Sequence, residues 1–194
     1  MNFKEIEGKL KNKKVGIAGC GGLGSNCAIA LARSGVGNFI LADFDLVAQG
    51  NLNRQYYFED QIGFLKVYAL KENLERINPN VQVKPFDIRL CPSDIYELYY
   101  DCDIIIEAFD DAKMKQTIIE TVLNEMPKMP LVIGNGLAGF GNTHTLKVRK
   151  EGNIYICGDE ITEISEENPP LAPRVGIVAH MQANVALEVL LAEE

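Results

Sequence analysis

Residues 15–24 read Val-Gly-Ile-Ala-Gly-Cys-Gly-Gly-Leu-Gly, a short apolar run that leads directly into a glycine-rich turn. Gly19, Gly21 and Gly24 form the pattern Gly-x-Gly-x-x-Gly, and residues 25–33 behind it are typical of a helix. The first glycine permits a tight turn, the second lets a phosphate approach the backbone, and the third lets the helix pack against the strand. Free N–H groups at the start of a helix attract an anion. The stretch therefore predicts a nucleotide-binding site; the alternative is a glycine-rich turn without a ligand.

An acidic residue stands at the distance from this loop that a nucleotide site requires. Asp43 lies 19 residues after Gly24 and ends a second apolar run, residues 38–42. A carboxylate at the end of the second strand can accept a hydrogen bond from a ribose hydroxyl. Runs that are apolar throughout are typical of strands buried on both faces, as in a parallel sheet covered by helices.

The rest of the chain repeats this alternation of strand and helix patterns. It predicts an α/β fold, Rossmann-like and doubly wound, with a mostly parallel sheet and an antiparallel C-terminal addition, in a single domain over residues 1–194. Residues 158–173 are acidic and contain prolines, which indicates a mobile crossover loop. We expect strands at 14–18, 38–43, 81–86, 103–108 and 130–133, helices at 61–77, 92–98, 112–124 and 174–191, and a hairpin of strands 144–149 and 153–157.

Composition excludes several classes of protein. A net charge of −8 disfavours a nucleic-acid partner, which needs a basic face. No apolar run approaches the ~20 residues of a membrane span, and the first residues lack an apolar signal core, so we expect a cytoplasmic protein. The five cysteines include no CxxC pair, which predicts that no zinc is bound. Only two histidines are present, so chemistry based on histidine is not expected.

Polar residues follow the predicted strands at the edge where ligands of doubly wound sheets bind. Arg54 and Lys66 are cations suited to phosphate oxygens, and Asp110 could hold Mg²⁺ through a carboxylate oxygen. Taken singly, these could be solvated surface charges, and Asp110 could cap the following helix. Behind a nucleotide loop, the set favours a site for a nucleoside triphosphate. Its members are Asp43, Asp45, Asn51, Asn53, Arg54, Gln55, Lys66, Asp110 and Asp111.

Linked blocks of sequence make a specific resemblance. Residues 19–25 (Gly-Cys-Gly-Gly-Leu-Gly-Ser), 43–47 (Asp-Phe-Asp-Leu-Val) and 51–55 (Asn-Leu-Asn-Arg-Gln) resemble the ThiF/MoeB/HesA family, relatives of the ubiquitin-activating enzymes. The resemblance covers residues 8–192. Further matches are Lys66 after Gly-Phe-Leu, Arg-Ile-Asn-Pro at 76–79, Phe-Asp-Asp at 109–111 and Ala-Pro-Arg-Val-Gly at 172–176.

The resemblance implies an activity. Members of the family bind ATP and Mg²⁺, join the C-terminal Gly-Gly carboxylate of a small ubiquitin-like protein to AMP, and release pyrophosphate. For this compact chain the implied partner is a ThiS-like sulfur carrier of thiamine biosynthesis, and the implied assembly is a homodimer. Arg54, Lys66 and Asp110 would be catalytic, with Asp110 holding Mg²⁺. The implied ATP-binding residues are Gly19, Gly21, Gly22, Gly24, Asp43, Asp45, Asn51, Arg54, Gln55 and Lys66.

The chain also departs from its relatives. It lacks the two CxxC pairs of the larger members, and residues 158–173 contain no cysteine that could bond covalently to the carrier. Cys157 is interpreted as a strand cysteine, so we expect activation without a thioester. Residues 1–13 contain no arginine to match the one that reaches the partner subunit's ATP in many relatives. Residues 134–136, Gly-Asn-Gly, are expected to leave room for the carrier tail.

Three other functions remain open at this point. An NAD-dependent oxidoreductase explains the glycine loop and Asp43 but leaves Arg54, Lys66 and Asp110 without a role. A non-catalytic scaffold that binds a ubiquitin-like partner fits the missing arginine. A tRNA-modifying dehydratase, also within the family, is disfavoured by the acidic charge.

Overall fold

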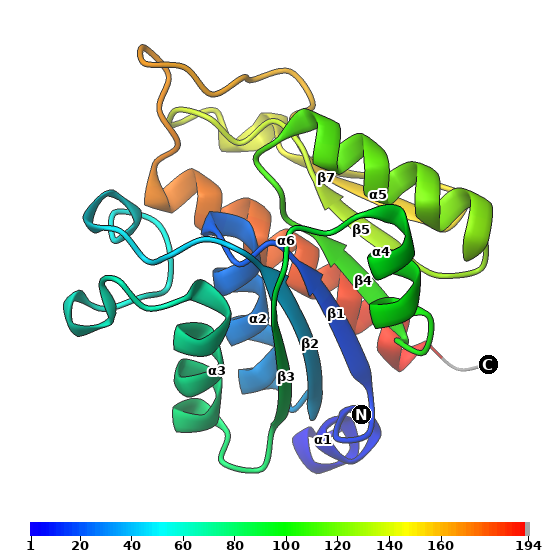
Figure 1. Cartoon of the computed structure of the whole chain (residues 1–194). Helices are drawn as coiled ribbons and strands as arrows, with labels where there is room; N and C mark the ends of the chain where they lie inside the picture. Colours follow the sequence, from blue (N-terminus) through cyan, green and yellow to red (C-terminus); the bar gives the residue numbers. More distant parts are fainter. Residues whose placement is uncertain (193–194) are drawn as a thin grey trace.

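A seven-stranded sheet organises the chain, and the computed structural model describes it over residues 1–192 (Figure 1). All neighbouring strands are parallel except β6 and β7, which form an antiparallel hairpin at one edge. This confirms the predicted Rossmann-like fold with an antiparallel addition. In spatial order the strands are β3 (Gln82–Asp87), β2 (Asn38–Asp43), β1 (Lys14–Ala18), β4 (Ile104–Glu107), β5 (Leu131–Gly134), β7 (Ile154–Gly158) and β6 (Lys147–Glu151).

Helices cover both faces of the sheet. Alternate side chains of the central strands enter different cores: Ile104 and Ile106 pack on one face and Ile105 on the other. The first core contains residues of α1 (Phe3–Leu10), α2 (Gly22–Ser34), α3 (Lys66–Ile77) and α6 (Ala172–Leu191). The second contains residues of α4 (Pro92–Tyr99) and α5 (Ala112–Glu125).

Local sequence sets the limits of the first βα unit. Helix α2 ends at Gly35, whose φ of 106° is the left-handed conformation that glycine adopts easily at a helix C-terminus. At the other end, the backbone N–H of Gly19 donates to Ala42 O at 2.9 Å, so the loop after β1 remains joined to β2. The glycine loop is therefore held at the carboxyl end of the sheet, where parallel strands place their ligands.

Two predicted elements begin at least three residues later than expected, while the bounds of most others shift by one to three residues. Helix α3 begins at Lys66 and not at residue 61, because Gly63 adopts a φ of 87° and Leu65 is extended, forming an isolated bridge to Leu46. Residues 59–61 instead form a short 3-10 turn. The hairpin strand predicted from residue 144 begins at Lys147, since Thr143–Thr145 is another 3-10 turn.

Residues 159–171 connect β7 to α6 without a regular helix or strand. They form the orange loop that rises above the sheet in Figure 1. A buried ion pair closes this loop at its base: Arg174 Nη2 lies 2.6 Å from Asp159 Oδ2. Arg174 also donates to Gly141 O at 2.6 Å, so one side chain ties together two loops. Within residues 1–192, no helix is long and apolar enough to span a membrane.

Candidate nucleotide-binding site

The three glycines of the Gly-x-Gly-x-x-Gly motif lack a side chain for different geometric reasons. Gly19 has a φ of 94°, and a Cβ there would lie 2.8 Å from Ala108 O. A Cβ on Gly24 would lie 1.9 Å from Gly19 O, so this position permits the close approach of α2 to the loop. A Cβ on Gly21 would meet only Gln55 Nε2, at 3.8 Å. The space beside Gly21 is therefore open toward a ligand, while Gly19 and Gly24 shape the turn itself.

The loop is buttressed by residues 54–57. The hydroxyl of Tyr57, a buried side chain, donates to Cys20 O at 2.7 Å. Ser25 Oγ accepts the N–H of Tyr56 at 3.0 Å, and Asn26 Nδ2 donates to Arg54 O at 2.9 Å. The segment that carries Arg54 is therefore fastened to the first turn of α2, beside the N–H groups that attract an anion.

Asp43 is positioned by backbone donors. Its Oδ2 accepts the N–H of Cys20 at 2.6 Å, and its Oδ1 accepts the N–H of Asp45 at 2.8 Å. Burial raises the pKa of Asp43 above its ordinary value, while the N–H groups of Asp45 and Cys20 and the charge of Lys66 oppose that rise. These contacts hold the carboxylate rigidly between the glycine loop and the end of β2.

Cationic and amide side chains lie near the glycine loop and Asp43. Lys66 is 5% exposed, and its Nζ lies 2.6 Å from Asp45 Oδ2. Arg54 Nη1 donates to Asn53 Oδ1 at 2.8 Å, which leaves other guanidinium donors for a ligand. Gln55 is 9% exposed, and its Oε1 is buried without a hydrogen-bond partner among residues 1–192. An unpaired buried amide indicates a missing polar partner.

One cavity of about 660 Å³ joins these groups. Gly24 and Asn51, both predicted to bind the nucleotide, are not among its lining residues. Gly24 serves helix packing, and Asn51 Oδ1 accepts the N–H of Ala48 at 2.9 Å within its own turn. The predicted residues that the structure does bring to the cavity wall are Gly19, Gly21, Gly22, Asp43, Asp45, Arg54, Gln55, Lys66, Asp110 and Asp111.

The two aspartates after β4 have different environments. Asp111 is the N-cap of α5, and its Oδ1 accepts the N–H of Met114 at 2.7 Å. Asp110 is exposed and lines the cavity without a hydrogen bond or ion pair to any residue in the range 1–192. The helix-capping role considered for Asp110 is thus taken by its neighbour. Asp110 remains available for a ligand.

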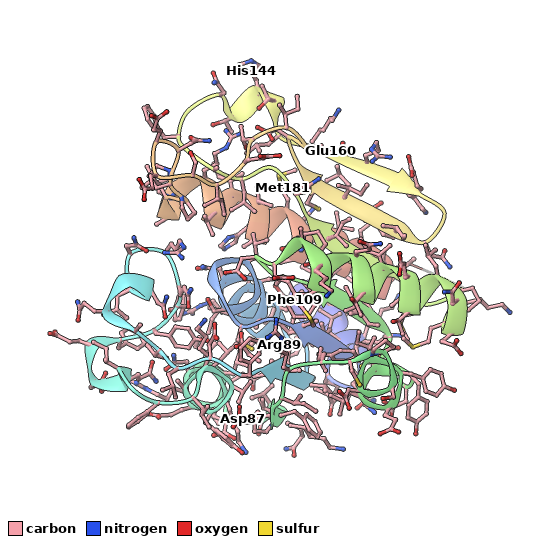
Figure 2. The ribbon with its side chains drawn as sticks, turned by 45° about the horizontal axis from the view of Figure 1, so that its top comes forward. Asp87, Arg89, Phe109, His144, Glu160 and Met181 are labelled. Atoms are coloured by element: carbon pink, nitrogen blue, oxygen red, sulfur yellow. The ribbon has the colours of Figure 1, made fainter. Side chains whose placement is uncertain are left out.

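The end of the cavity under β2 and β3 was not predicted from the sequence. Phe44 follows β2, Arg89 follows β3, and the Arg89 Cζ lies 5.3 Å from the Phe44 ring centroid. Ile88 and Leu90 line the same end. Figure 2 labels Arg89 near the middle of the view, close to the label of Phe109, which also lines the cavity. An aromatic ring exposed directly after Asp43 was the available signal, because such a ring suits a flat base.

Gly134 and Gly136 have no space for a side chain. An ideal Cβ on Gly134 would lie 2.4 Å from Leu23 Cδ1, and one on Gly136 would lie 2.0 Å from Asp159 Oδ1. The small size of both glycines accommodates Leu23 and the anchor of the 159–171 loop. These contacts explain why glycines stand at positions 134 and 136, while the path of the carrier tail past residues 134–136 stays a prediction.

Cys157 is a buried strand residue whose environment disfavours a thiolate. Burial raises its pKa to about 12. A thiol is nucleophilic as the thiolate, and this one is protonated at neutral pH. The environment agrees with the interpretation of Cys157 as a strand cysteine.

Comparison with known proteins gives concordant matches. The sequence profile of the ThiF family matches residues 3–194. The molybdopterin-synthase adenylyltransferase of Haemophilus influenzae is 31% identical over 191 residues, which cover 94% of this chain and 76% of that protein. The adenylyltransferase and sulfurtransferase UBA4 of Vanderwaltozyma polyspora is 29% identical over 194 residues, 95% of this chain; the chain spans only 44% of its length.

Solved structures share the fold. The tRNA N6-threonylcarbamoyladenosine dehydratase of E. coli, solved in complex with AMP, superposes with a TM-score of 0.87. The match covers 96% of this chain and 89% of that one at 20% identity. At this identity the likeness establishes the fold, and function has to be argued from the site.

Proposed function

The chain belongs to the ThiF family, and from that premise we propose that it transfers the adenylyl group of ATP to the C-terminal carboxylate of a ubiquitin-fold sulfur carrier protein. One observation carries the proposal: a single cavity joins the glycine loop, Asp43, Arg54, Lys66 and the unpaired Asp110. An oxidoreductase would use the first two and leave the cations without a role. Adenylyl transfer uses all of them.

The nucleotide has a natural orientation in this cavity. The base lies at the β2–β3 end, against Phe44 and Arg89, and the ribose hydroxyls meet Asp43. The phosphates then lie over Gly21 and the N-terminus of α2, where backbone N–H groups and the helix dipole favour negative charge. Arg54 and Lys66 face them from the side of the cavity. The unpaired Oε1 of Gln55 is an acceptor, so it suits a hydrogen-bond donor of the ligand and not a phosphate oxygen.

The reaction needs little acid–base chemistry. The attacking carboxylate has an ordinary pKa of about 3.5 and is ionised at pH 7. One of its oxygens bonds to the α-phosphorus, the bond from that phosphorus to the β-phosphate oxygen breaks, and pyrophosphate leaves with the electron pair. The protein's task is to align two anions and to stabilise the charge that develops on the phosphate oxygens. Arg54 and Lys66 are suited to this task.

Asp110 fits a magnesium ion in the proposal. Mg²⁺ is commonly held by one or two carboxylates together with substrate phosphates and water, so a cluster of three protein ligands is not needed. Within residues 1–192 no such cluster of acidic, histidine or cysteine side chains occurs. When bound, Mg²⁺ would neutralise phosphate charge; Asp110, exposed and without a partner, is the residue that would hold it.

The finer parts of the proposal concern the partner and the assembly. We assign a ThiS-like carrier on the resemblance; the two matched relatives are both named adenylyltransferases, one for molybdopterin synthase and one that is also a sulfurtransferase. A homodimer in the cytoplasm completes the proposal. Support for the dimer comes from strand β6, an edge strand whose residues are largely exposed and which a second subunit could cover.

ATP–pyrophosphate exchange tests the function. Purified protein, Mg²⁺ and a ThiS-like carrier ending in Gly-Gly should give exchange that needs the carrier and is lost in Asp110→Ala. Asp60→Ala, an exposed aspartate in the 59–61 turn outside the cavity, is the matched control and should retain full exchange. Exchange with the carrier of molybdopterin synthase alone would keep the activity and replace the ThiS assignment. ATP binding without exchange would favour the scaffold, and tight NAD binding without ATP binding would favour the oxidoreductase.

A further inference from the structure

Strand β4 ends with a charge where its neighbours are apolar. The strand reads Ile-Ile-Ile-Glu, and Glu107 has no exposed surface. Its side chain pairs with Lys115, one turn into α5, which is only 21% exposed at the side chain. A buried ion pair is usually no more stable than apolar residues of the same size, so its presence calls for a reason other than stability.

The contacts of the pair concentrate on one turn. Glu107 Oε1 accepts the N–H of Phe109 at 2.8 Å, within the turn that leads to Asp110. Lys115 Nζ bonds Glu107 Oε2 and also donates to Gly134 O at 2.9 Å. The pair therefore ties the β4–α5 turn to the end of β5.

The β4–α5 turn is also held by contacts with α6 and with the glycine loop. Gln182, a fully buried residue of α6, donates to Glu107 O at 2.9 Å. On the other side the turn touches the glycine loop, since a Cβ on Gly19 would lie 2.8 Å from Ala108 O. A displacement of the turn would shift Asp110 and press on the loop that receives the phosphates. The position of the backbone at residues 108–110 is thus set by Glu107, Lys115 and Gln182, none of which lines the cavity.

We infer that Glu107 and Lys115 are positioning residues, whose ion pair holds the β4–α5 turn so that Asp110 meets the metal-bound phosphates of ATP. The inference rests on the proposed function. Neither side chain lines the cavity, so neither touches the nucleotide directly. Their effect passes through the backbone of Phe109 and the direction in which Asp110 leaves the turn.

The test separates metal-dependent binding from folding. Variants Glu107→Gln and Lys115→Met remove one charge each, and Lys115→Arg keeps the charge. The matched control is Asp103→Asn. Asp103 directly precedes β4, at the end of the strand away from Glu107, and the substitution breaks its 3.1 Å ion pair with Lys13. For each protein, ATP affinity is measured by calorimetry with and without Mg²⁺, together with the melting temperature and carrier-dependent exchange.

In the wild type, Mg²⁺ should tighten ATP binding. The ratio of the two affinities should fall at least fivefold in Glu107→Gln and Lys115→Met and recover in Lys115→Arg, while metal-free ATP affinity stays within twofold. Exchange should fall at least tenfold in the first two variants. The double variant should lose no more than the worse single one, because both residues act through one contact.

Three results would overturn the inference: an unchanged affinity ratio in both variants, equal losses with and without Mg²⁺, or a wild type whose ATP affinity ignores Mg²⁺. The first of these, in a wild type that shows normal exchange, would leave the proposed function intact. If the wild type lacks exchange but its affinity ratio responds as expected, the proposed function fails and the positioning role stands.

Discussion

Replacing Gly21 by alanine should separate nucleotide binding from folding. The backbone at Gly21 has φ −80° and ψ −147°, so an alanine would need ψ to turn by about 30° to reach the extended region, and its added Cβ would find only Gln55 Nε2 at 3.8 Å. The folded chain therefore has space for the methyl group. A phosphate that approaches the same backbone does not.

The magnitudes follow from that geometry. Gly21 is the N-cap of α2, and glycine is preferred to alanine there by about 0.5–1 kcal/mol. For a chain of this size the melting temperature should fall by about 1–4 °C. Losing one backbone hydrogen bond to a charged phosphate costs about 1.5–3 kcal/mol, so ATP affinity should fall about 10- to 100-fold.

Calorimetric titration with ATP, beside thermal unfolding, measures both effects. Gly8→Ala is the control: Gly8 lies in α1 with nothing within 4 Å of an ideal Cβ, so ATP affinity should not change. Gly24→Ala should instead lose about 3 kcal/mol or more of stability, because its Cβ would lie 1.9 Å from Gly19 O. A Gly21→Ala protein that binds ATP as tightly as the wild type would refute a phosphate position beside this glycine.

Three further predictions concern side chains of the cavity. Lys66→Met should slow carrier-dependent exchange about 100-fold or more, as expected for loss of a cation that stabilises developing charge, and exchange within threefold of wild type would contradict its role. Burial raises the pKa of Asp43 above its ordinary value, and the ionised carboxylate accepts the ribose hydroxyl more strongly than the protonated carboxyl group does. ATP affinity measured against pH should therefore begin to fall at a higher pH than an ordinary aspartate would give, and Asp43→Asn should remove that dependence. Arg89→Ala should weaken ATP binding about 2- to 5-fold through loss of the packed Arg89–Phe44 pair, without slowing the exchange at saturating ATP.

Most of the fold could be predicted from local patterns of apolar and polar residues in the sequence. Strand β1 and strand β2 have the predicted boundaries, because the positions that are buried in them, 15–18 and 39–42, form continuous runs without a polar side chain. The start of α3 was misplaced because an isolated bridge from Leu65 to Leu46 decides it, a contact between residues 19 positions apart. The helix propensity of residues 61–65 does not depend on that contact, so it could not predict where the helix begins.

Candidate site residues could be predicted from the sequence where their place at the end of a strand decides that they line the cavity. Residues at the carboxyl ends of β1, β2 and β4, or within three positions after them, reach the cavity because parallel strands end together, which is why Gly21, Asp43 and Asp110 share it. Asn51 belongs to an irregular segment, and its side chain turns into its own 3-10 turn. Glu107 was overlooked inside an apolar run, although one carboxylate among isoleucines is itself a signal, because a buried charge needs a partner.

The most direct test of the account is the intact mass of the carrier protein after incubation with the enzyme, ATP and Mg²⁺. The carrier should gain the mass of one adenylyl group, hydroxylamine should remove that mass, and a carrier that lacks its C-terminal Gly-Gly should gain nothing. The enzyme itself should gain no covalent carrier under non-reducing conditions. A carrier of unchanged mass across ThiS-like and molybdopterin-synthase substrates, in the presence of enzyme that binds ATP, would contradict adenylyl transfer as the function of this chain.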